Sequence, residues 1–157
     1  MSEQVLKIMS GGKCSNEKIM MTMLENSLGV LHYVINLETS RYDYVSPSSQ
    51  SILGFTPDEV KSLGVGGFSA RIHSDDKKLV NDNFDCRYLG QDITLHIEYR
   101  FLHRDGSCRW LCDDRFVLYD EDGSAIAIIG EIREVTAEKN LEHRLYSICN
   151  KYQIAEV

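Results

Sequence analysis

Two Asp-Gly turns join three long extended runs in the C-terminal half of the chain, and this spacing constrains the fold more than any other feature of the sequence. The runs are 93–103, 108–119 and 125–135, with turns at Asp105-Gly106 and Asp122-Gly123. Asp-Gly favours hairpins because both residues accept positive φ. The runs are rich in β-branched and aromatic residues and alternate with a period of two. They predict a three-stranded antiparallel meander, long enough to twist and to cup helices or a ligand on one face.

The totals indicate a single soluble domain with terminal extensions. The chain has 157 residues, which is enough for a sizeable core, and a net charge of −7. This charge argues against nucleic acid or an anionic membrane as the main partner. We expect no membrane insertion, because no apolar run approaches the roughly 18 residues of a span, and no export, because an apolar leader core is missing. The five scattered cysteines fit reduced thiols in a cytoplasmic protein.

The N-terminal part begins with a weakly patterned segment, 1–14, which we expect to be a flexible tail. A capped start at Ser15-Asn16-Glu17 predicts an amphipathic helix over 15–28. Its apolar residues follow at three- and four-residue spacing: Ile19, Met20, Met23, Leu24, Leu28 and Leu31. This helix either packs on its own domain or forms a dimer contact.

A hairpin and several short helices are predicted between this helix and the meander. The hairpin pairs 30–37 with 41–45, and Ser46-Pro47 predicts the start of a short helix that ends at Gly54. The sequence Thr56-Pro57-Asp58-Glu59 is a capping box and opens a helix to about Leu63. Glycines at 64–67 break that helix, and 68–72 forms a helical turn. A longer helix is then expected from Ser74-Asp75-Asp76 to Gly90.

The last segment, 137–157, predicts a helix that Thr136 caps and whose apolar residues step by four and three. These residues are Leu141, Leu145, Ile148, Tyr152 and Ala155. The pattern spans about two heptads, which is shorter than an established coiled coil. The helix therefore either forms a dimer seam or folds back on the sheet.

Catalytic motifs are not evident, and we expect no enzyme activity. The sequence contains no Gly-rich phosphate loop, no G-x-S-x-G and no H-E-x-x-H. The acidic pair Asp75-Asp76 lies at a helix start, and Asp113-Asp114 is interpreted as the polar, solvent side of a strand.

A metal site is not predicted either. Cys108 and Cys112 share one strand face, but four strand residues span about 13 Å, whereas the sulfurs of one zinc site lie within about 4 Å of each other. Adding His96, His103 or Cys86 makes a site conceivable but unsupported. Buried, inert thiols are the simpler interpretation.

Three stretches of the chain resemble the PAS domains, and specifically the subgroup that carries a C-terminal PAC motif. The first runs from Tyr44 through Ser46-Pro47 and Leu53-Gly54-Phe55 to Glu59. The second, Ile72-His73-Ser74-Asp75-Asp76, is similar to the family's "hPDD", with Ser74 in place of Pro. The third runs from Glu98 through Asp105-Gly106 to Trp110, and Glu134-Val135-Thr136 is similar to the family's terminal Asp-Ile-Thr.

The resemblance implies an α+β fold with a five-stranded antiparallel sheet, short helices on one face and a small-molecule pocket between them. The PAS domain would span 29–136, with the PAC motif at 93–136 and a C-terminal signalling helix at 137–157. Our candidates for the pocket lining are Phe68, Ile72, Phe84, Tyr88 and Trp110. A filled aromatic core is the alternative for these residues. The candidates for signal relay are Glu134, Val135 and Thr136, since the family's terminal Asp ties the last strand to the helix.

No cofactor is indicated by a motif. A histidine could ligate haem, but none is placed on the long helix toward the predicted pocket. Asp85–Gln91 is similar to the Asn-Cys-Arg-Phe-Leu-Gln of flavin photosensors, yet Cys86 falls too late in the chain, so we interpret the match as coincidence.

The function expected from the resemblance is that of a cytoplasmic sensor or regulatory domain of a signal-transduction protein. It would sense a small ligand or cofactor and relay the change to an output domain, such as a histidine kinase or a diguanylate cyclase, or to a partner. The alternative is a ligand-free PAS module for protein interaction or dimerisation. We expect a homodimer through either terminal helix, because two amphipathic helices flank one small core.

Overall fold

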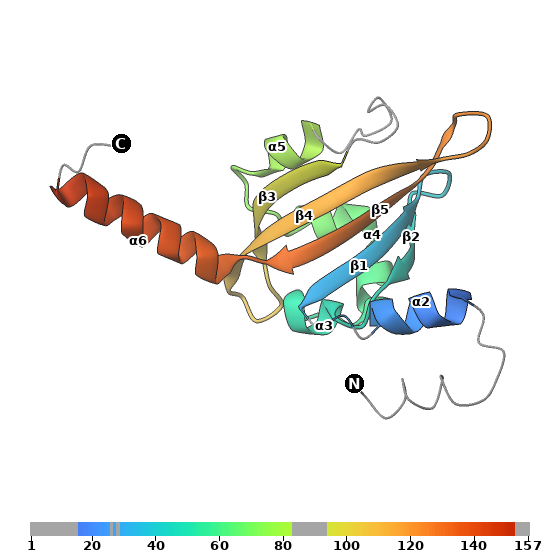
Figure 1. Ribbon diagram of the computed structural model, residues 1–157, viewed down its shortest axis with the longest axis horizontal. Helices are drawn as coiled ribbons and strands as arrows, with labels where there is room; N and C mark the ends of the chain where they lie inside the picture. Colours follow the sequence, from blue (N-terminus) through green and yellow to red (C-terminus); the bar gives the residue numbers. More distant parts are fainter. Residues whose placement is uncertain (1–15, 26, 28, 83–93, 153–157) are drawn as a thin grey trace.

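The computed structural model describes residues 16–25, 27, 29–82 and 94–152 (Figure 1). Its elements, in chain order, are α2 (Asn16–Glu25), β1 (Val30–Asn36), β2 (Arg41–Val45), α3 (Ser49–Ile52), α4 (Pro57–Ala70), α5 (Lys77–Asp82), β3 (Leu95–Leu102), β4 (Cys108–Tyr119), β5 (Ala125–Glu134) and α6 (Thr136–Tyr152). Some expectations lie outside the described residues: the tail at 1–14, the continuation of α5 to Gly90, and the positions of Phe84, Cys86, Tyr88 and Ala155.

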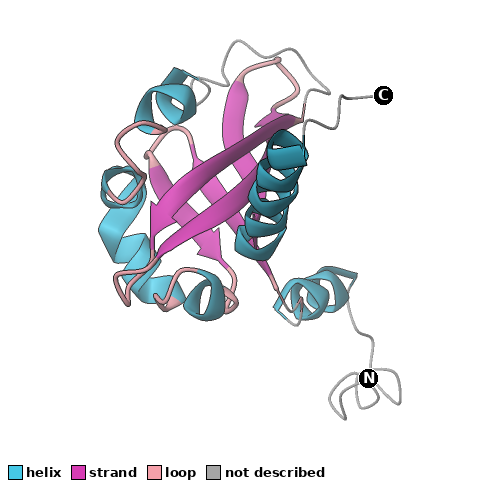
Figure 2. Cartoon of the chain, turned by 90° about the vertical axis from the view of Figure 1, so that its left-hand side faces the viewer, coloured by secondary structure: helices cyan, strands magenta, loops and turns pink. Residues whose placement is uncertain are grey.

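The five strands form one antiparallel sheet in the order β2-β1-β5-β4-β3. The predicted hairpin and the predicted meander are both present, and β5 joins them by pairing with β1 from Val30↔Arg133 to Asn36↔Ala127. β5 is therefore a central strand with a neighbour on each edge, and its buried residues alternate along it because only its inner face packs on the core. The helices α3, α4 and α5 connect the two edge strands and gather on one side of the sheet (Figure 2). The α+β fold expected from the sequence is confirmed.

The core lies between these helices and the inner face of the sheet. Alternate residues of three strands point into it, as the period of two predicts. They include Leu31, Tyr33 and Ile35 of β1, Ile97, Tyr99 and Phe101 of β3, and Ile128 and Ile132 of β5. The helices contribute Ile52, Val60 and Val80. Full burial of each large apolar side chain stabilises the fold by about 1.5–3 kcal/mol.

Helix α4 begins at the predicted capping box and bends at the predicted glycine break. The Thr56 hydroxyl accepts a hydrogen bond from the Glu59 main-chain N–H at 3.3 Å, and the Glu59 carboxylate accepts one from the Thr56 N–H at 2.9 Å. This reciprocal capping box satisfies N–H groups that have no partner inside the helix. A kink follows at Gly64, whose φ of 64° and ψ of −178° leave the helical region. The predicted glycine break is therefore a bend within α4, which carries the chain over the core.

Two local predictions are wrong. The short helix starts at Ser49 and not at Ser46-Pro47, because the Ser46 hydroxyl accepts from the His32 N–H at 2.9 Å and the Ser48 hydroxyl donates to the Val30 carbonyl at 2.6 Å. These serines bind β1 instead of capping a helix. Leu31 does not belong to the N-terminal helix, which ends at Glu25; it is a core residue of β1 and is 2% exposed.

Candidate functional site

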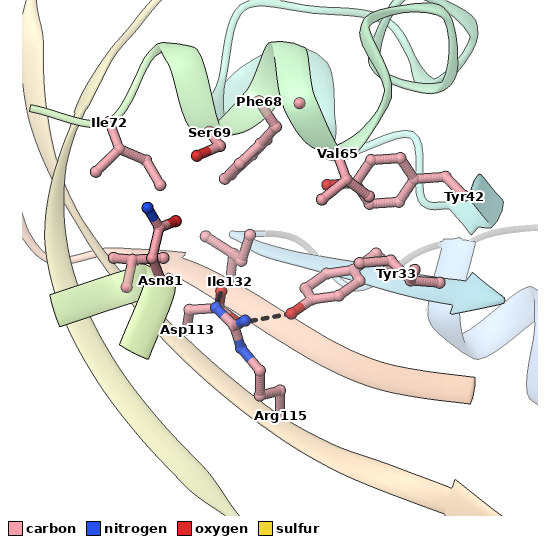
Figure 3. Close-up of a pocket in the computed structure, with 13 residues that line it drawn as sticks. Tyr33, Tyr42, Val65, Phe68, Ser69, Ile72, Asn81, Asp113, Arg115 and Ile132 are labelled. Carbon is pink, nitrogen blue, oxygen red and sulfur yellow. Dashed lines mark hydrogen bonds and ion pairs between the residues drawn. The ribbon is translucent and has the colours of Figure 1, made fainter. Parts of the chain in front are cut away.

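A cavity of about 150 Å³ lies between the inner face of the sheet and α4 (Figure 3). Its wall comes from four strands, from the kinked half of α4 and the residues that follow it, and from α5: Tyr33, Ile35, Tyr42, Val65, Gly66, Phe68, Ser69, Ile72, Val80, Asn81, Asp113, Arg115 and Ile132. Gly66 and Asn81 are exposed whereas most of the strand residues are buried, so the cavity extends from the core toward the surface between α4 and α5. Cavities of about this size admit a molecule such as benzene.

A buried ion pair forms the polar part of this wall. Asp113 and Arg115 lie two residues apart on β4, so both side chains point to the inner face, where they contact each other. Each residue is 2% exposed. The Asp113 carboxylate also accepts the Tyr33 hydroxyl at 2.9 Å and the Tyr99 hydroxyl at 3.2 Å. One cation and two phenols therefore converge on a single carboxylate at the bottom of the cavity.

The electrostatics of this cluster follow from its burial. Burial raises the pKa of Asp113, while the Arg115 guanidinium and the two hydroxyls favour the ionised carboxylate. Burial and then the negative charge of Asp113 raise the pKa of Tyr33 and of Tyr99 well above the usual value, so both phenols remain protonated donors. A buried ion pair rarely stabilises a fold more than an apolar replacement would. Its position in a cavity wall is instead typical of a binding site.

A glycine on β5 makes room for the cluster. Gly130 lies opposite Tyr33 on β1 and opposite Arg115 on β4. A Cβ atom at Gly130 would lie 2.4 Å from the Tyr33 ring, closer than any real contact. The missing side chain lets the Tyr33 ring lie across β5 and bring its hydroxyl to Asp113. On the opposite side of the cavity, the Phe68 ring packs at a centroid distance of 4.8 Å from Phe101 and supplies an apolar wall.

The predicted pocket residues divide into three groups. Phe68 and Ile72 line the cavity. Phe84 and Tyr88 lie outside the described residues. Trp110 requires a correction: it lies on the outer face of β4, where Lys139 and Arg100 are placed over its ring with centroid distances of 5.8 and 5.5 Å. Its position next to the buried Leu111 explains this, because successive strand side chains point to opposite faces.

The polar part of the cavity wall was not predicted from the sequence. Asp113-Asp114 was interpreted as the solvent side of a strand, but only Asp114 faces outward, and Asp113 is buried. The parity of β4 carries the missing signal, since Asp113 and Arg115 share it with Leu111 and Val117, two residues of the apolar face. Two opposite charges at strand positions whose side chains face the core indicate a buried ion pair.

The residues predicted for signal relay tie α6 to β4. The Glu134 carboxylate accepts from Arg109 at 3.0 Å, and the Val135 N–H donates to the Trp110 carbonyl at 2.8 Å. The Thr136 hydroxyl accepts from the Trp110 N–H at 3.0 Å. Thr136 therefore does not cap the helix as expected: the Lys139 N–H donates to the Val135 carbonyl, so Val135 takes the capping position. The hydroxyl of Thr136 instead anchors the first turn of α6.

Helix α6 leaves the sheet at the end of β5 and projects from the domain (Figure 1). Three of its predicted seam residues are exposed: Leu141 is 57%, Leu145 53% and Ile148 49% exposed, whereas the side chains of Tyr152 and Ala155 lie outside the described part of the chain. The expected heptad stripe is thus present in the helix but is open to a partner. Among the residues that the structure describes, no helix has the length and apolar character needed to cross a membrane.

The size of the cavity limits what it can hold. Sites for drug-sized ligands measure roughly 300–1,000 Å³. As bounded by the described residues, the cavity of about 150 Å³ lies below that range. Its chemistry suits a small molecule with an apolar body against Phe68 and Ile72 and a polar group toward Asp113 and Arg115.

Comparisons with known proteins agree with the fold described above. A family model described as "PAS fold" matches residues 42–132. The N-terminal domain of a diguanylate cyclase with PAS/PAC sensor from Marinobacter aquaeolei has 28% identity and a TM-score of 0.63, over 70% of this chain and 98% of that one.

Two further solved structures have the same fold. A sensory box histidine kinase/response regulator from Burkholderia thailandensis E264 has 24% identity and a TM-score of 0.66, over 86% of this chain and 98% of that one. A PAS domain from Colwellia psychrerythraea has 16% identity and a TM-score of 0.64, over 78% and 99%. No curated protein matches the chain significantly.

Proposed function

The chain belongs to the PAS fold family, and from this premise we propose that it is a non-catalytic sensor domain of a cytoplasmic signal-transduction protein. A small ligand binds in the cavity, and the change passes through α6 to an output domain. The observation that carries the proposal is the cavity whose wall contains the buried Asp113–Arg115 pair. The similarity to a diguanylate cyclase sensor and to a sensory box histidine kinase favours an output of one of these two types.

The relay is supported by strand β4, which carries both ends of the route. Asp113 and Arg115 on this strand face the cavity, and Arg109 and Trp110 on the same strand hold Glu134, Val135 and Thr136. Asp113 lies three positions after Trp110 along the strand, a distance of about 10 Å. A ligand that moves the ion pair shifts β4, and the hydrogen bonds of Trp110 transmit this shift to the root of α6.

The output also depends on assembly, and we propose a homodimer. The exposed stripe of Leu141, Leu145 and Ile148 fits a parallel pair of α6 helices from two copies of the chain. In such a pair, a movement of α6 in one copy would reach the other copy. The N-terminal helix is a second candidate contact, since Met21 and Met23 are 41% and 67% exposed. Replacing Leu145 with Glu is expected to convert a dimer into a monomer in light scattering. A wild-type monomer at tens of micromolar would contradict the dimer.

The ligand proposal is tested by native mass spectrometry and an absorbance spectrum of the purified protein, followed by thermal shifts with phenol, benzoate and benzyl alcohol as probes. We expect a bound small mass or a raised Tm with at least one probe. Val65→Phe fills the cavity and should abolish the shift, whereas Ala70→Phe places the same ring at an exposed position of the same helix and should not. An equal response of both variants would contradict binding in the cavity.

A ligand-free module for protein interaction is the second candidate. The observation that favours it is the exposed stripe of α6, which needs a partner whether or not a ligand binds. Under this alternative, Val65→Phe leaves output and assembly unchanged, while Leu145→Glu disrupts both. A loss of ligand response in Val65→Phe with an intact dimer would exclude it.

A further inference from the structure

Four side chains of the types that bind metals lie together on the outer face of the sheet, opposite the cavity. His96 and Glu98 belong to β3, and Cys112 and Asp114 belong to β4. The antiparallel register places His96 beside Asp114 and Glu98 beside Cys112. Within the described part of the chain, one donor atom from each of His96, Glu98 and Cys112 lies within 4.8 Å of the other two.

The distances in this cluster fit the edges of a metal coordination polyhedron. The Cys112 Sγ atom lies 3.7 Å from His96 Nδ1, 4.0 Å from His96 Nε2 and 3.6 Å from the nearer Asp114 oxygen. In a tetrahedral zinc site the bond lengths place a sulfur and a nitrogen or oxygen ligand about 3.5 Å apart. The two sulfur–nitrogen separations are within about half an ångström of that value, and one Glu98 oxygen lies within 4.8 Å of the His96 and Cys112 donor atoms, so the Glu98 side chain would move closer on binding. His96 has a side chain that is 58% exposed, so its ring is free to make the adjustment.

We propose that His96, Glu98 and Cys112 form a binding site for a divalent transition-metal ion, with Zn²⁺ as its occupant. A thiolate, an imidazole and a carboxylate together suit zinc better than magnesium or calcium, which prefer oxygen ligands alone. Asp114 supports the site, because its carboxylate is 2.6 Å from His96 Nδ1. A carboxylate that accepts the N–H of one ring nitrogen orients the other nitrogen toward a metal.

Metal binding requires Cys112 to lose its thiol proton, and neighbouring side chains influence the charge of the thiolate that forms. Cys112 is 2% exposed, and burial, followed by the charge of Asp114, raises the pKa of its thiol to about 11. Binding therefore forms a zinc–sulfur bond and releases the thiol proton to solvent. Arg133 lies 3.5 Å from Sγ and 3.4 Å from an Asp114 oxygen, so a cation is already placed beside the thiolate that forms.

Occupancy of this site would act on α6. The Lys139 ammonium in the first turn of α6 lies 2.6 Å from a Glu98 oxygen and 3.1 Å from Glu142. A metal that binds Glu98 competes with Lys139 for this carboxylate and weakens a link between β3 and the root of the helix. The proposal thus adds a metal input on the outer face, independent of the ligand in the cavity.

The test is a titration of the reduced, untagged protein with Co²⁺, which replaces Zn²⁺ and reports a bound thiolate by a charge-transfer band. We expect one Co²⁺ per chain and displacement of the band by Zn²⁺. Cys112→Ser should lose the band, and His96→Ala should weaken binding at least tenfold. Cys108→Ser and Cys149→Ser are matched controls, because both are exposed free cysteines, and their titrations should equal the wild type.

Circular dichroism of each variant checks that it is folded, and His96→Ala changes an exposed side chain, so it keeps the test valid if Cys112→Ser is unstable. A band that persists in folded Cys112→Ser, or no binding by the wild type at millimolar Co²⁺, would overturn the proposal.

Discussion

Replacing Arg115 with Met would remove the cation of the buried pair and leave the Asp113 carboxylate with its two tyrosine donors alone. Loss of one partner of a buried ion pair destabilises a protein by about 3–5 kcal/mol, because the remaining charge is no longer compensated. For a domain of this size, 1 kcal/mol shifts the Tm by roughly 2–4 °C. We therefore expect the Tm of Arg115→Met to fall by about 10 °C at pH 7.

The pH dependence gives this prediction a second, sharper test. Burial raises the pKa of Asp113, and in the variant no guanidinium opposes that effect. The folded variant then holds a proton that the unfolded chain releases above about pH 4. Above about pH 4 the unfolded chain therefore binds fewer protons than the folded variant. The free energy of unfolding of the variant then decreases as pH rises from about 4 toward neutrality, so its deficit relative to the wild type grows with pH and shrinks as pH falls. Urea unfolding at pH 4.5 and pH 7.5 should show this difference relative to the wild type.

The double variant Asp113→Asn/Arg115→Met is the control. It removes both charges and keeps a side-chain oxygen that can accept the Tyr33 and Tyr99 hydroxyls, so it should recover most of the stability lost by Arg115→Met, with a residual deficit of about 1–2 kcal/mol from repacking. If the single and double variants were equally unstable, or if the deficit of the single variant did not change with pH, the uncompensated charge would not be the cause.

Three further substitutions test other parts of the structure. Gly130→Ala places a Cβ atom 2.4 Å from the Tyr33 ring and should lower the free energy of unfolding by about 1–3 kcal/mol in urea titrations. Thr136→Val removes the acceptor of a β4 main-chain N–H, and hydrogen exchange in the first turn of α6 should become faster, with a stability loss of about 1 kcal/mol. Asp76→Asn weakens the contacts to Arg100; because the pKa of Asp76 is lowered, the loss relative to wild type should be full at pH 7 and should disappear as pH falls through that lowered pKa.

Matched controls separate these effects from general damage. Gly66→Ala changes a glycine of the cavity wall where an added Cβ atom meets nothing within 4 Å, so it should leave stability nearly unchanged. Ser147→Ala removes a hydroxyl from an exposed part of α6 and should leave exchange in the first turn as it is. Equal losses in variant and control would refute the contacts assigned above.

Much of the fold follows from local signals in the sequence. The Asp-Gly turns and the period of two define the meander, and the Thr56 capping box and the glycines after it define the kinked α4. The start of α3 could not be predicted from local signals. The serine of a Ser-Pro pair caps a helix only when its hydroxyl is free to do so, and the Ser46 hydroxyl instead accepts the distant His32 N–H. A contact across 14 residues leaves no trace in local propensity.

The candidate site was harder to predict for the same reason. Phe68 and Ile72, two of the candidates that the PAS resemblance suggested, are large apolar residues that line the cavity. Asp113 and Arg115 were missed, since burial of charge becomes favourable only when a partner and two hydroxyls from β1 and β3 converge on it. The outer group of His96, Glu98 and Cys112 could not be assembled from spacing along β4, even with His96 as an added donor, because these residues meet across the pairing of β3 with β4.

Strand β4 connects both proposed inputs, and this leads to a final prediction. Cys112 faces the metal cluster, and Asp113, its neighbour in the chain, faces the cavity. A shift of β4 in response to one ligand must therefore change the geometry offered to the other, and such coupling is reciprocal. We expect Arg115→Met to weaken Co²⁺ binding by about fivefold or more, although Arg115 does not face the metal. Lys78→Ala, which alters an exposed pair on α5, should leave the affinity unchanged. An identical Co²⁺ affinity in wild type and folded Arg115→Met would show that β4 does not transmit a structural change between its two faces. A change caused by a ligand in the cavity would then have to reach α6 by another route.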